Sequence, residues 1–336
     1  MMIAYLQIFF KIGVMSMNEL TLQKGFELFL ASGRMYWSPS TSVYYKRNVF
    51  YFVQYAENIL NDRADHIPVD ELPRDILMQY VVWLRSKSRY DSHPLYDSMQ
   101  VSGHIKSNTV NSYMRAVKAF FNFLYDRNYT TIRFTKGLRL PRGDSDQIIP
   151  LLNSEVALID RLFDRSTPLG LRNLCMVHLM LDAGLRACEV INLSPKDLLF
   201  TSGAIAIHKS KGNKSRIVIM CPPLASMLQE YIKMCHPSGS LFSSQNGGAG
   251  ISYSVLRSLF LRIGKQTGII RIHPHLLRHT FATSYIMGGG NLESLRILLG
   301  HYDYTVTRNY LHLASQNQLL RMDIYRLDPI FFQKFY

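Results

Sequence analysis

Six residues in the second half of the chain carry side chains that can bind anions and exchange protons. They are two arginines, a lysine, two histidines and a tyrosine, each at a break in the local pattern: Arg186, Lys211, His275, Arg278, His301 and Tyr310. A guanidinium holds anionic oxygens with a rigid fork of donors, and histidine changes its charge near neutral pH. Their conjunction in one basic region indicates a functional site more strongly than any one of them does.

Each of these residues also has an ordinary structural explanation. Arg186 and Glu189, three positions apart, form a common kind of surface ion pair, although Glu189 could also hold the guanidinium in place. Lys211 lies in a polar run typical of a hairpin tip, and one tyrosine among 20 is usually a packing residue. The segment 273–279 lacks the histidine spacing of a metal-binding helix and has no carboxylate nearby, so we predict no metal.

The second half of the chain predicts a mostly helical domain that carries these residues beside one small sheet. The segments 204–209 and 215–220 alternate with period two around a Lys-Gly-Asn turn, which is typical of an antiparallel hairpin. Apolar periodicity predicts helices over 153–163, 170–183, 252–265, 274–287, 292–299 and 305–313. The first is expected to be capped by Asn153 or Ser154, and the last by Thr305.

The first half of the chain has the periodicity of a small helical bundle. Helices are expected over 21–31, 42–60, 73–86 and 107–127. The last of these has one apolar face and cap candidates at Ser107, Asn108 and Thr109. Four basic residues lie off the apolar stripes and are candidate phosphate contacts, or simply a solvated face: Lys46, Arg47, Arg115 and Lys118.

The predicted fold class is therefore mainly α, a helical N-terminal bundle followed by a mixed, mostly helical domain with a small antiparallel β-sheet. A length of 336 residues suits two domains. Gly, Pro and charged residues interrupt every period between them, which indicates a linker. The expected divisions are an N-terminal extension, the bundle, the linker, the second domain and a tail: 1–19, 20–136, 137–150, 151–314 and 315–336.

The charge balance indicates a polyanionic partner. The net charge is +14, and residues 1–150 and 151–336 contribute +5 and +9, so the excess is not confined to a tail. Nucleic acid is the first candidate and an anionic membrane the second. With 47% hydrophobic residues, the composition excludes an intrinsically disordered chain.

Targeting and redox signals favour a soluble protein of a reducing cytoplasm. No stretch reaches the roughly 18–20 apolar residues that span a bilayer. The apolar segment 1–17 resembles a secretory signal only superficially, because Lys11 interrupts it, and Met17 is an equally plausible start. The four cysteines form no C-x-x-C pair, and Cys175 and Cys188 are expected to be buried thiols.

The four motifs of the second half resemble one known family. They are GLRACE at 184–189, SKGNK at 210–214, HPHLLRH at 273–279, and LGH with a tyrosine nine residues on, at 299–310. They follow in the order and spacing of the tyrosine recombinase (phage-type integrase) family. The segment 107–128 resembles the helical core-binding domain of that family, so the resemblance extends from about residue 20 to about 315. A simple two-domain, Xer-like architecture is implied.

The resemblance implies a role for each motif residue. The phosphate site would comprise Arg186, Lys211, His275, Arg278 and His301. Tyr310 would attack phosphorus and leave a 3′-phosphotyrosyl bond and a free 5′-hydroxyl, followed by strand exchange and religation without ATP or metal. His275 is the expected base and Lys211 the expected acid, and His301 would bind a phosphate oxygen.

Neighbouring residues are assigned lesser roles. Tyr302 and Tyr304 fall in the expected connecting turn, so Tyr310 is preferred as the nucleophile. His279 is expected to be structural, and His273 lies outside the pattern. Glu189 is a supporting residue. The lysines that flank Lys211 are candidate contacts to the DNA backbone: Lys209 and Lys214.

The implied partner is double-stranded DNA with paired recombination sites, held between the two domains by a homotetramer. We expect no cofactor, no small-molecule substrate, no membrane association and a nucleoid location. The apolar tail 315–336 would dock either on its own domain or on a neighbouring subunit. The sequence leaves open which process the recombination belongs to: chromosome or plasmid resolution, phage integration or transposition. A type IB topoisomerase and a DNA-binding regulator without catalysis remain alternatives.

Overall fold

The computed structural model describes residues 20–87, 104–143, 148–208, 215–243, 250–301, 307, 308 and 310. The chain divides into two compact units between residues 146 and 147, a point within the segment 137–150 that was predicted as a linker. Lys209, Lys211, Lys214, Tyr302, Tyr304, Thr305, the extension 1–19 and the tail 315–336 lie outside the described residues. No helix in the described ranges has the length and apolar character that a membrane span requires.

The first unit is a helical bundle, as predicted. In its described part the helices are α2 (Leu22–Gly33), α3 (Pro39–Leu60), α4 (Ile76–Ser86) and α5 (Ser107–Asp126), with a short 3₁₀ turn, η2 (Val69–Glu71). An aromatic cluster joins α2 to α5, since the Phe29 ring of α2 lies 4.9 Å from Trp37 and 5.6 Å from Phe120 of α5, centroid to centroid. Such edge-to-face pairs add to the burial of apolar area.

Some helix starts in this unit differ from the prediction. Helix α3 begins at Pro39 and not at 42, because the Ser38 hydroxyl accepts from the Thr41 N–H and caps it. Helix α4 begins at Ile76, three residues later than expected. The capping prediction for α5 is wrong, because Lys106 occupies the N-cap and no side chain caps the helix.

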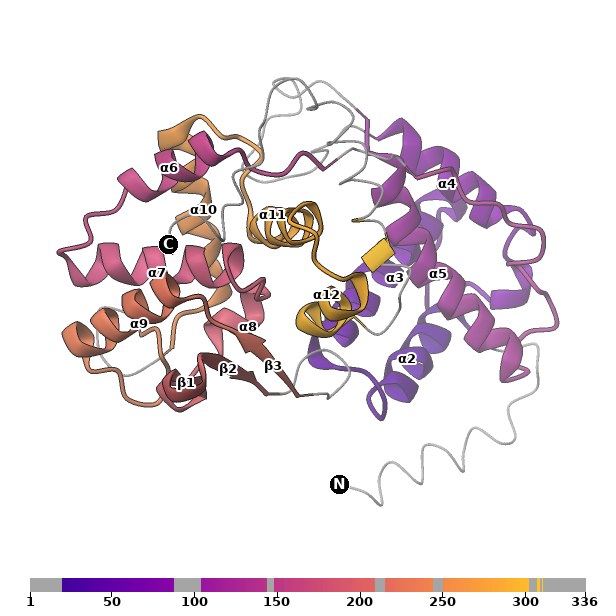
Figure 1. Ribbon diagram of the computed structural model, residues 1–336. Coiled ribbons are helices and arrows are strands. Elements are labelled where there is room, and N and C mark those ends of the chain that lie inside the picture. The colour runs from indigo at the N-terminus through magenta and orange to yellow at the C-terminus, as the bar shows by residue number, and fades with distance from the viewer. Residues whose placement is uncertain are drawn as a thin grey trace, which may run out of the picture. The chain divides into compact units, whose positions relative to one another are not determined.

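The second unit is mostly helical (Figure 1) and is organised around one buried helix. Helix α7 (Pro168–Leu181) packs against both α9 (Pro222–Cys235) and α11 (Pro274–Met287). The other elements in its described part are α6 (Asn153–Arg161), α8 (Ala187–Ile191), η3 (Pro195–Asp197), η4 (Phe200–Ser202), α10 (Tyr253–Thr267) and α12 (Leu292–Leu299). Most of α7 is buried, from Gly170 through Leu181, so it forms the centre of the core.

The predicted hairpin is present as part of a three-stranded antiparallel sheet. The strands are β1 (Leu198–Leu199), β2 (Ala204–Ile207) and β3 (Arg216–Ile219), in the order β1-β2-β3. Ile205 pairs with Val218, and Ile207 pairs with Arg216. Helix α12 packs on β3 and on α11, which brings the end of α12 beside the sheet.

Four details of this unit correct the sequence analysis. The two-residue strand β1 and the helix α9, whose first turn contains two prolines, were not predicted. Helix α6 is not capped by Asn153 or Ser154; Leu152 is the N-cap, and the Glu155 carboxylate accepts from its N–H at 2.9 Å. Cys175 is buried as expected, but Cys188 is exposed, because it faces away from the core on the short helix α8.

A protonated histidine joins α6 to α7 and makes stability depend on pH. The His178 ring nitrogens lie 2.8 Å from Asp182 Oδ2 and 2.9 Å from Asp160 Oδ1. Burial lowers its pKa, but the two carboxylate hydrogen bonds outweigh burial and raise it from 6.5 to about 10. The stabilisation is therefore complete below the unfolded-state value and is lost as pH rises through the folded-state value.

We expect the urea midpoint of the second unit to fall as pH increases from 7 to 10. In His178→Gln this fall should nearly disappear, with a loss on the order of 2–3 kcal/mol at pH 7, because two carboxylates lose their cation. His208→Gln is the matched control, since the exposed ring of His208 lies 3.3 Å from Asp197; it should stay within about 0.5 kcal/mol of wild type. A His178→Gln profile parallel to wild type would refute the assignment.

Candidate active site

Arg278 is the most buried of the predicted site residues that the structure describes. It lies on α11 with 3% of its surface exposed. Nη1 donates to the Gly184 carbonyl and Nη2 to the Leu299 carbonyl, both at 2.6 Å. Gly184 has a φ of 66°, and a Cβ there would lie 2.5 Å from the Phe281 ring, so this turn requires glycine. The turn thus presents its carbonyl to the guanidinium.

Arg186 is held at the start of α8 by a buried carboxylate. Its Nη1 donates to Glu189 Oε1 at 2.9 Å, and its backbone N–H donates to Glu189 Oε2 at 2.8 Å. Its Nη2 donates to the Gly300 carbonyl at 3.2 Å. Glu189 is 7% exposed, so this is not an ordinary surface pair. The arrangement agrees with the expectation that Glu189 holds the guanidinium.

Sequence reasoning missed a third arginine, Arg216, the first residue of β3. Its Nη1 and Nη2 each donate to a Glu189 oxygen at 2.7 Å, and its Nε donates to the Leu298 carbonyl at 2.7 Å. The side chain is 7% exposed. The period of a strand places Arg216 on the same face as the buried Val218, and that phase is the signal that could have found it.

Three successive carbonyls at the C-terminal end of α12 each accept from a different arginine. Leu298 accepts from Arg216, Leu299 from Arg278, and Gly300 from Arg186. The last carbonyls of a helix lack partners within the helix and carry negative partial charge. The end of α12 therefore gathers guanidiniums from β3, α11 and the turn before α8.

The cluster has an excess of positive charge. Burial first, and then the neighbouring Arg186, lower the pKa of Arg278 to about 9. Burial opposes ionisation of Glu189, but hydrogen bonds and charge from Arg216 and Arg186 lower its pKa to about 2. One carboxylate thus faces three guanidiniums, an arrangement that favours binding of an anionic group.

His301, just beyond α12, is a neutral ring in contact with Arg278. Its Nε2 lies 3.2 Å from Arg278 Nη2, and its Nδ1 lies 3.0 Å from Thr307 Oγ1. A guanidinium can only donate, so Nε2 accepts and the ring proton is on Nδ1, facing Thr307. Burial and then Arg278 lower the pKa of His301 to about 4. Sequence reasoning did not identify Thr307, which is fully buried.

His275 is exposed at the first turn of α11, three residues before Arg278. Partial burial of the ring, followed by the charges of Arg278 and His273, lowers its pKa below the ordinary value. The lowered pKa favours the neutral imidazole. A neutral ring at this position can accept a proton.

Tyr310 is buried between two imidazoles. Its ring centroid lies 5.3 Å from that of His279 and 6.2 Å from that of His301, nearly parallel to the latter. The side chain is 4% exposed and belongs to a cluster with Phe281, Leu295 and Leu299. Burial raises the pKa of Tyr310, whereas the charges of Arg278 and Arg186 lower it. Both guanidiniums therefore interact electrostatically with the phenol.

His279 is a neutral neighbour of Tyr310. Its Nδ1 is buried and has no hydrogen-bond partner among the described residues. Burial first, and then His275 and Arg278, lower its pKa to about 4. Its contact with Tyr310 agrees with the structural role that was expected for it.

The structure brings together five of the six predicted site residues, and Lys211 lies outside its described part. The candidate DNA contacts of the first unit lie on α3 and α5: Lys46, Arg47 and Arg115 are exposed, and Lys118 is half-buried. Arg47 borders a pocket of about 290 Å³ that also has Ser40 and Thr109 in its lining. Whether they bind DNA remains a prediction.

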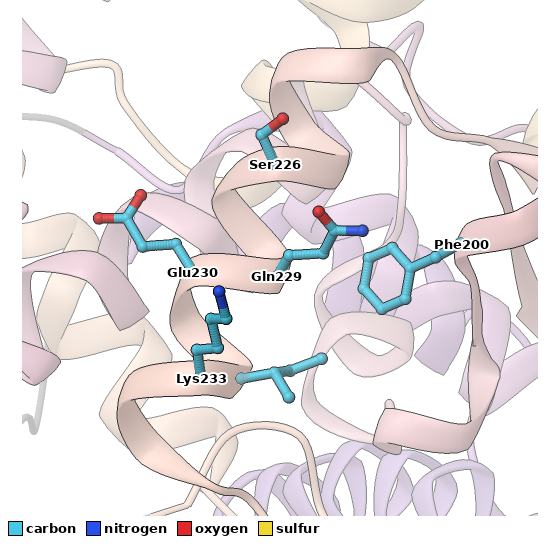
Figure 2. A pocket seen from close by; sticks show the side chains of 6 residues that line it. Phe200, Ser226, Gln229, Glu230 and Lys233 are labelled. Atoms are coloured by element: carbon cyan, nitrogen blue, oxygen red, sulfur yellow. The ribbon is translucent and has the colours of Figure 1, made fainter.

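A second pocket, in the second unit, contains none of the predicted site residues. It has a volume of about 460 Å³ and lies along α9, beside η4, lined by Phe200, Ser226, Gln229, Glu230, Ile232 and Lys233 (Figure 2). The Glu230 carboxylate accepts from Arg165 at 2.6 Å. Neither of these two pockets is lined by an arginine of the cluster described above. The candidate active site is therefore the arginine cluster and not a pocket.

Comparisons with known proteins agree with this choice. Residues 152–317 match the phage integrase family. The chain is 28% identical over 310 residues to tyrosine recombinase XerC of Lactobacillus delbrueckii subsp. bulgaricus, covering 89% of this chain and 96% of the relative. It is 33% identical over 219 residues to a tyrosine recombinase of Pseudothermotoga lettingae, covering 64% and 73%.

Solved structures show the same fold. The Tn1549 transposon integrase superposes with a TM-score of 0.64 at 17% identity, covering 90% of this chain and 99% of that chain. The XerH site-specific recombinase superposes with a TM-score of 0.63 at 20% identity, covering 85% and 80%. The sequence matches show that the chain belongs to the tyrosine recombinase (phage integrase) family and is a site-specific DNA recombinase, and the fold agrees with them.

Proposed function

We propose that the chain cleaves and rejoins duplex DNA through Tyr310, at a phosphate held by the arginine cluster. One observation supports this most directly: Tyr310, Arg186, Arg278 and His301 lie together within one unit of one chain. The phenol that attacks and the cations that stabilise the developing charge therefore come from the same subunit.

The two guanidiniums account for the electrostatic part of the reaction. Attack on phosphorus creates a pentacoordinate state whose non-bridging oxygens gain negative charge. Arg278 and Arg186 are already fixed by α12 carbonyls, so they need no reorganisation when that charge appears. The cluster has three guanidiniums and only one carboxylate, and a bound phosphate supplies further negative charge.

Proton transfer completes the proposed step. The Tyr310 oxygen forms a bond to phosphorus while the bond from phosphorus to the 5′ oxygen breaks. The phenolic proton passes to His275, and Lys211 gives a proton to the 5′ oxygen, which leaves as a hydroxyl. In the reverse direction a 5′-hydroxyl of another duplex attacks the 3′-phosphotyrosyl bond, so rejoining needs neither ATP nor metal. His301 packs beside Tyr310. When the phosphate takes over Arg278, the His301 ring adopts the tautomer with its proton on Nε2, which donates to a phosphate oxygen while Nδ1 accepts from the Thr307 hydroxyl.

Duplex DNA is the proposed partner. A XerH structure has been solved bound to a palindromic difH substrate, and Tn1549 integrase structures have been solved with circular-intermediate DNA. The net charge of +14 supports the same partner for this chain. The proposed backbone contacts are Lys46, Arg47, Arg115, Lys118, Lys209 and Lys214.

The proposed assembly is a homotetramer on two paired sites of a mobile element or replicon, in the cytoplasm. The bundle 20–136 would act as the core-binding domain and 151–314 as the catalytic domain, joined by 137–150. The tail 315–336 would dock on a neighbouring subunit. The numbers of Lys and Arg in both halves suit two domains that close around one duplex.

The proposal is tested on a duplex nicked close to the cleavage site. Cleavage then releases a short fragment that carries the new 5′-hydroxyl, so religation cannot occur and the covalent adduct accumulates. We expect the wild-type chain to accumulate a covalent adduct on its own site, with the same yield in excess chelator, because the arginines supply the positive charge. Peptide mass mapping should place the adduct on Tyr310. Dependence on added metal would overturn the metal-free step, and site-independent relaxation of supercoils would favour a topoisomerase.

A further inference from the structure

We propose that Arg216 is a positioning residue for DNA cleavage, which keeps Arg186 directed at the scissile phosphate by bracing Glu189 against the end of α12. This inference rests on the proposed function, because it assigns Arg186 to the phosphate. It adds a residue outside the predicted catalytic set.

The guanidinium of Arg216 donates to groups of the protein that hold Arg186 and α12 in place. Its Nη1 and Nη2 donate to the two oxygens of Glu189, and its Nε donates to the Leu298 carbonyl, all at 2.7 Å. The side chain is almost completely buried. A planar guanidinium with three such bonds has one orientation available, so it acts as a rigid strut.

Glu189 transmits this rigidity to Arg186. Oε1 accepts from the Nη1 atoms of both arginines, and Oε2 accepts from the Arg186 backbone N–H and from Arg216 Nη2. Arg216 thus supplies two of the four hydrogen bonds that orient this carboxylate. Without them Glu189 can rotate, and the fork of Arg186 rotates with it.

The end of α12 provides the second point of attachment for both arginines. Arg216 binds the Leu298 carbonyl, and Arg186 binds the Gly300 carbonyl two residues later. Gly300 has a φ of 63°, and a Cβ there would lie 3.0 Å from Arg216 Cδ. A side chain at Gly300 would therefore press on Arg216, and the positive φ disfavours one independently. Glu189, the end of α12 and the two arginines thus form one hydrogen-bonded network.

The test compares single-turnover cleavage of the nicked duplex by substitution variants. We expect Arg216→Met to cleave about 10²-fold more slowly, because a small misplacement of a catalytic group has effects of this size. Arg216→Lys, which keeps the charge but not the fork, should be at least about 10-fold slower. DNA affinity should change by less than about threefold in both variants. Wild-type cleavage rates in Arg216→Lys would overturn the proposal.

Arg165→Met is the matched control. Arg165 also donates through Nε and Nη2 to a glutamate, Glu230, but at an exposed site away from the cluster. Its cleavage rate should equal that of wild type. The double variant Arg216→Met with Glu189→Gln removes both buried charges together, and its melting temperature shows whether the unit still folds.

A second background separates positioning from general support of the fold. If Arg216 acts through Arg186, then Arg216→Met should slow cleavage by less than about threefold in a chain that already carries Arg186→Lys. An equal loss in both backgrounds would overturn the proposal. A wild-type chain that forms no adduct would instead refute the proposed function, so the two failures are distinguishable.

Discussion

Tyr310→Phe should abolish the covalent protein–DNA adduct, with a loss of at least about 10⁴-fold in single-turnover cleavage. The substitution removes only the phenolic oxygen, the atom proposed to attack phosphorus. The ring remains in its cluster with Phe281, Leu295 and Leu299, so the fold and the packing against His279 should persist. The measurement is adduct formation on a nicked duplex, followed by denaturing gel.

Three other tyrosines provide controls for this result. Tyr302→Phe and Tyr304→Phe test the neighbours in sequence, and Tyr285→Phe tests a tyrosine packed against the same apolar cluster. Each should form adduct at the wild-type rate. Tyr310→Phe should also bind DNA as tightly as wild type. Adduct formation by Tyr310→Phe would transfer the nucleophile to another residue.

Arg278→Lys should slow cleavage by about 10³-fold, the second-largest effect expected. The guanidinium donates to two carbonyls and contacts His301 at once, from a position that is 3% exposed. A lysine ammonium is a point charge that cannot satisfy both carbonyls and bind phosphate bidentately. Loss of one preorganised donor alone typically costs roughly 10²–10³ in rate.

Stability should respond much less than rate to this substitution. Unpaired carbonyls at Gly184 and Leu299 cost about 1–3 kcal/mol, but removal of a crowded guanidinium offsets part of that. Arg271→Lys is the control, because Arg271 binds Glu155 through two nitrogens at an exposed position. It should cleave at the wild-type rate. An Arg278→Lys rate within tenfold of wild type would remove Arg278 from the proposed mechanism.

Local signals in the sequence predicted those helices whose ends are marked by their own residues. Helix α11 begins at Pro274 and α12 ends before Gly300, and both have the predicted bounds. A cap or a positive φ is a property of a few adjacent residues, so the sequence contains it. Helix α9 and the cap of α6 were missed, because the residues at their N-caps, Cys221 and Leu152, are not the types that usually cap a helix.

The residues of the candidate site also fall into two groups, those marked by a local motif and those that only the fold reveals. Motif spacing identified Arg186, Arg278, His301 and Tyr310, and the structure places them together. Arg216 and Thr307 have no motif that marks them. The partners of Arg216 lie 27 and 82 residues away in the chain, so its role depends on how β3 meets α8 and α12.

By itself, the sequence determined the family, the fold class, the basic character and the residues at which chemistry is proposed. These depend on residue types and on short-range order, which survive in a linear pattern. Only the tertiary structure decided that one helix end binds three arginines, that Glu189 joins two of them, and that Tyr310 is buried between His279 and His301. These are contacts between distant segments, and they form only when the core packs.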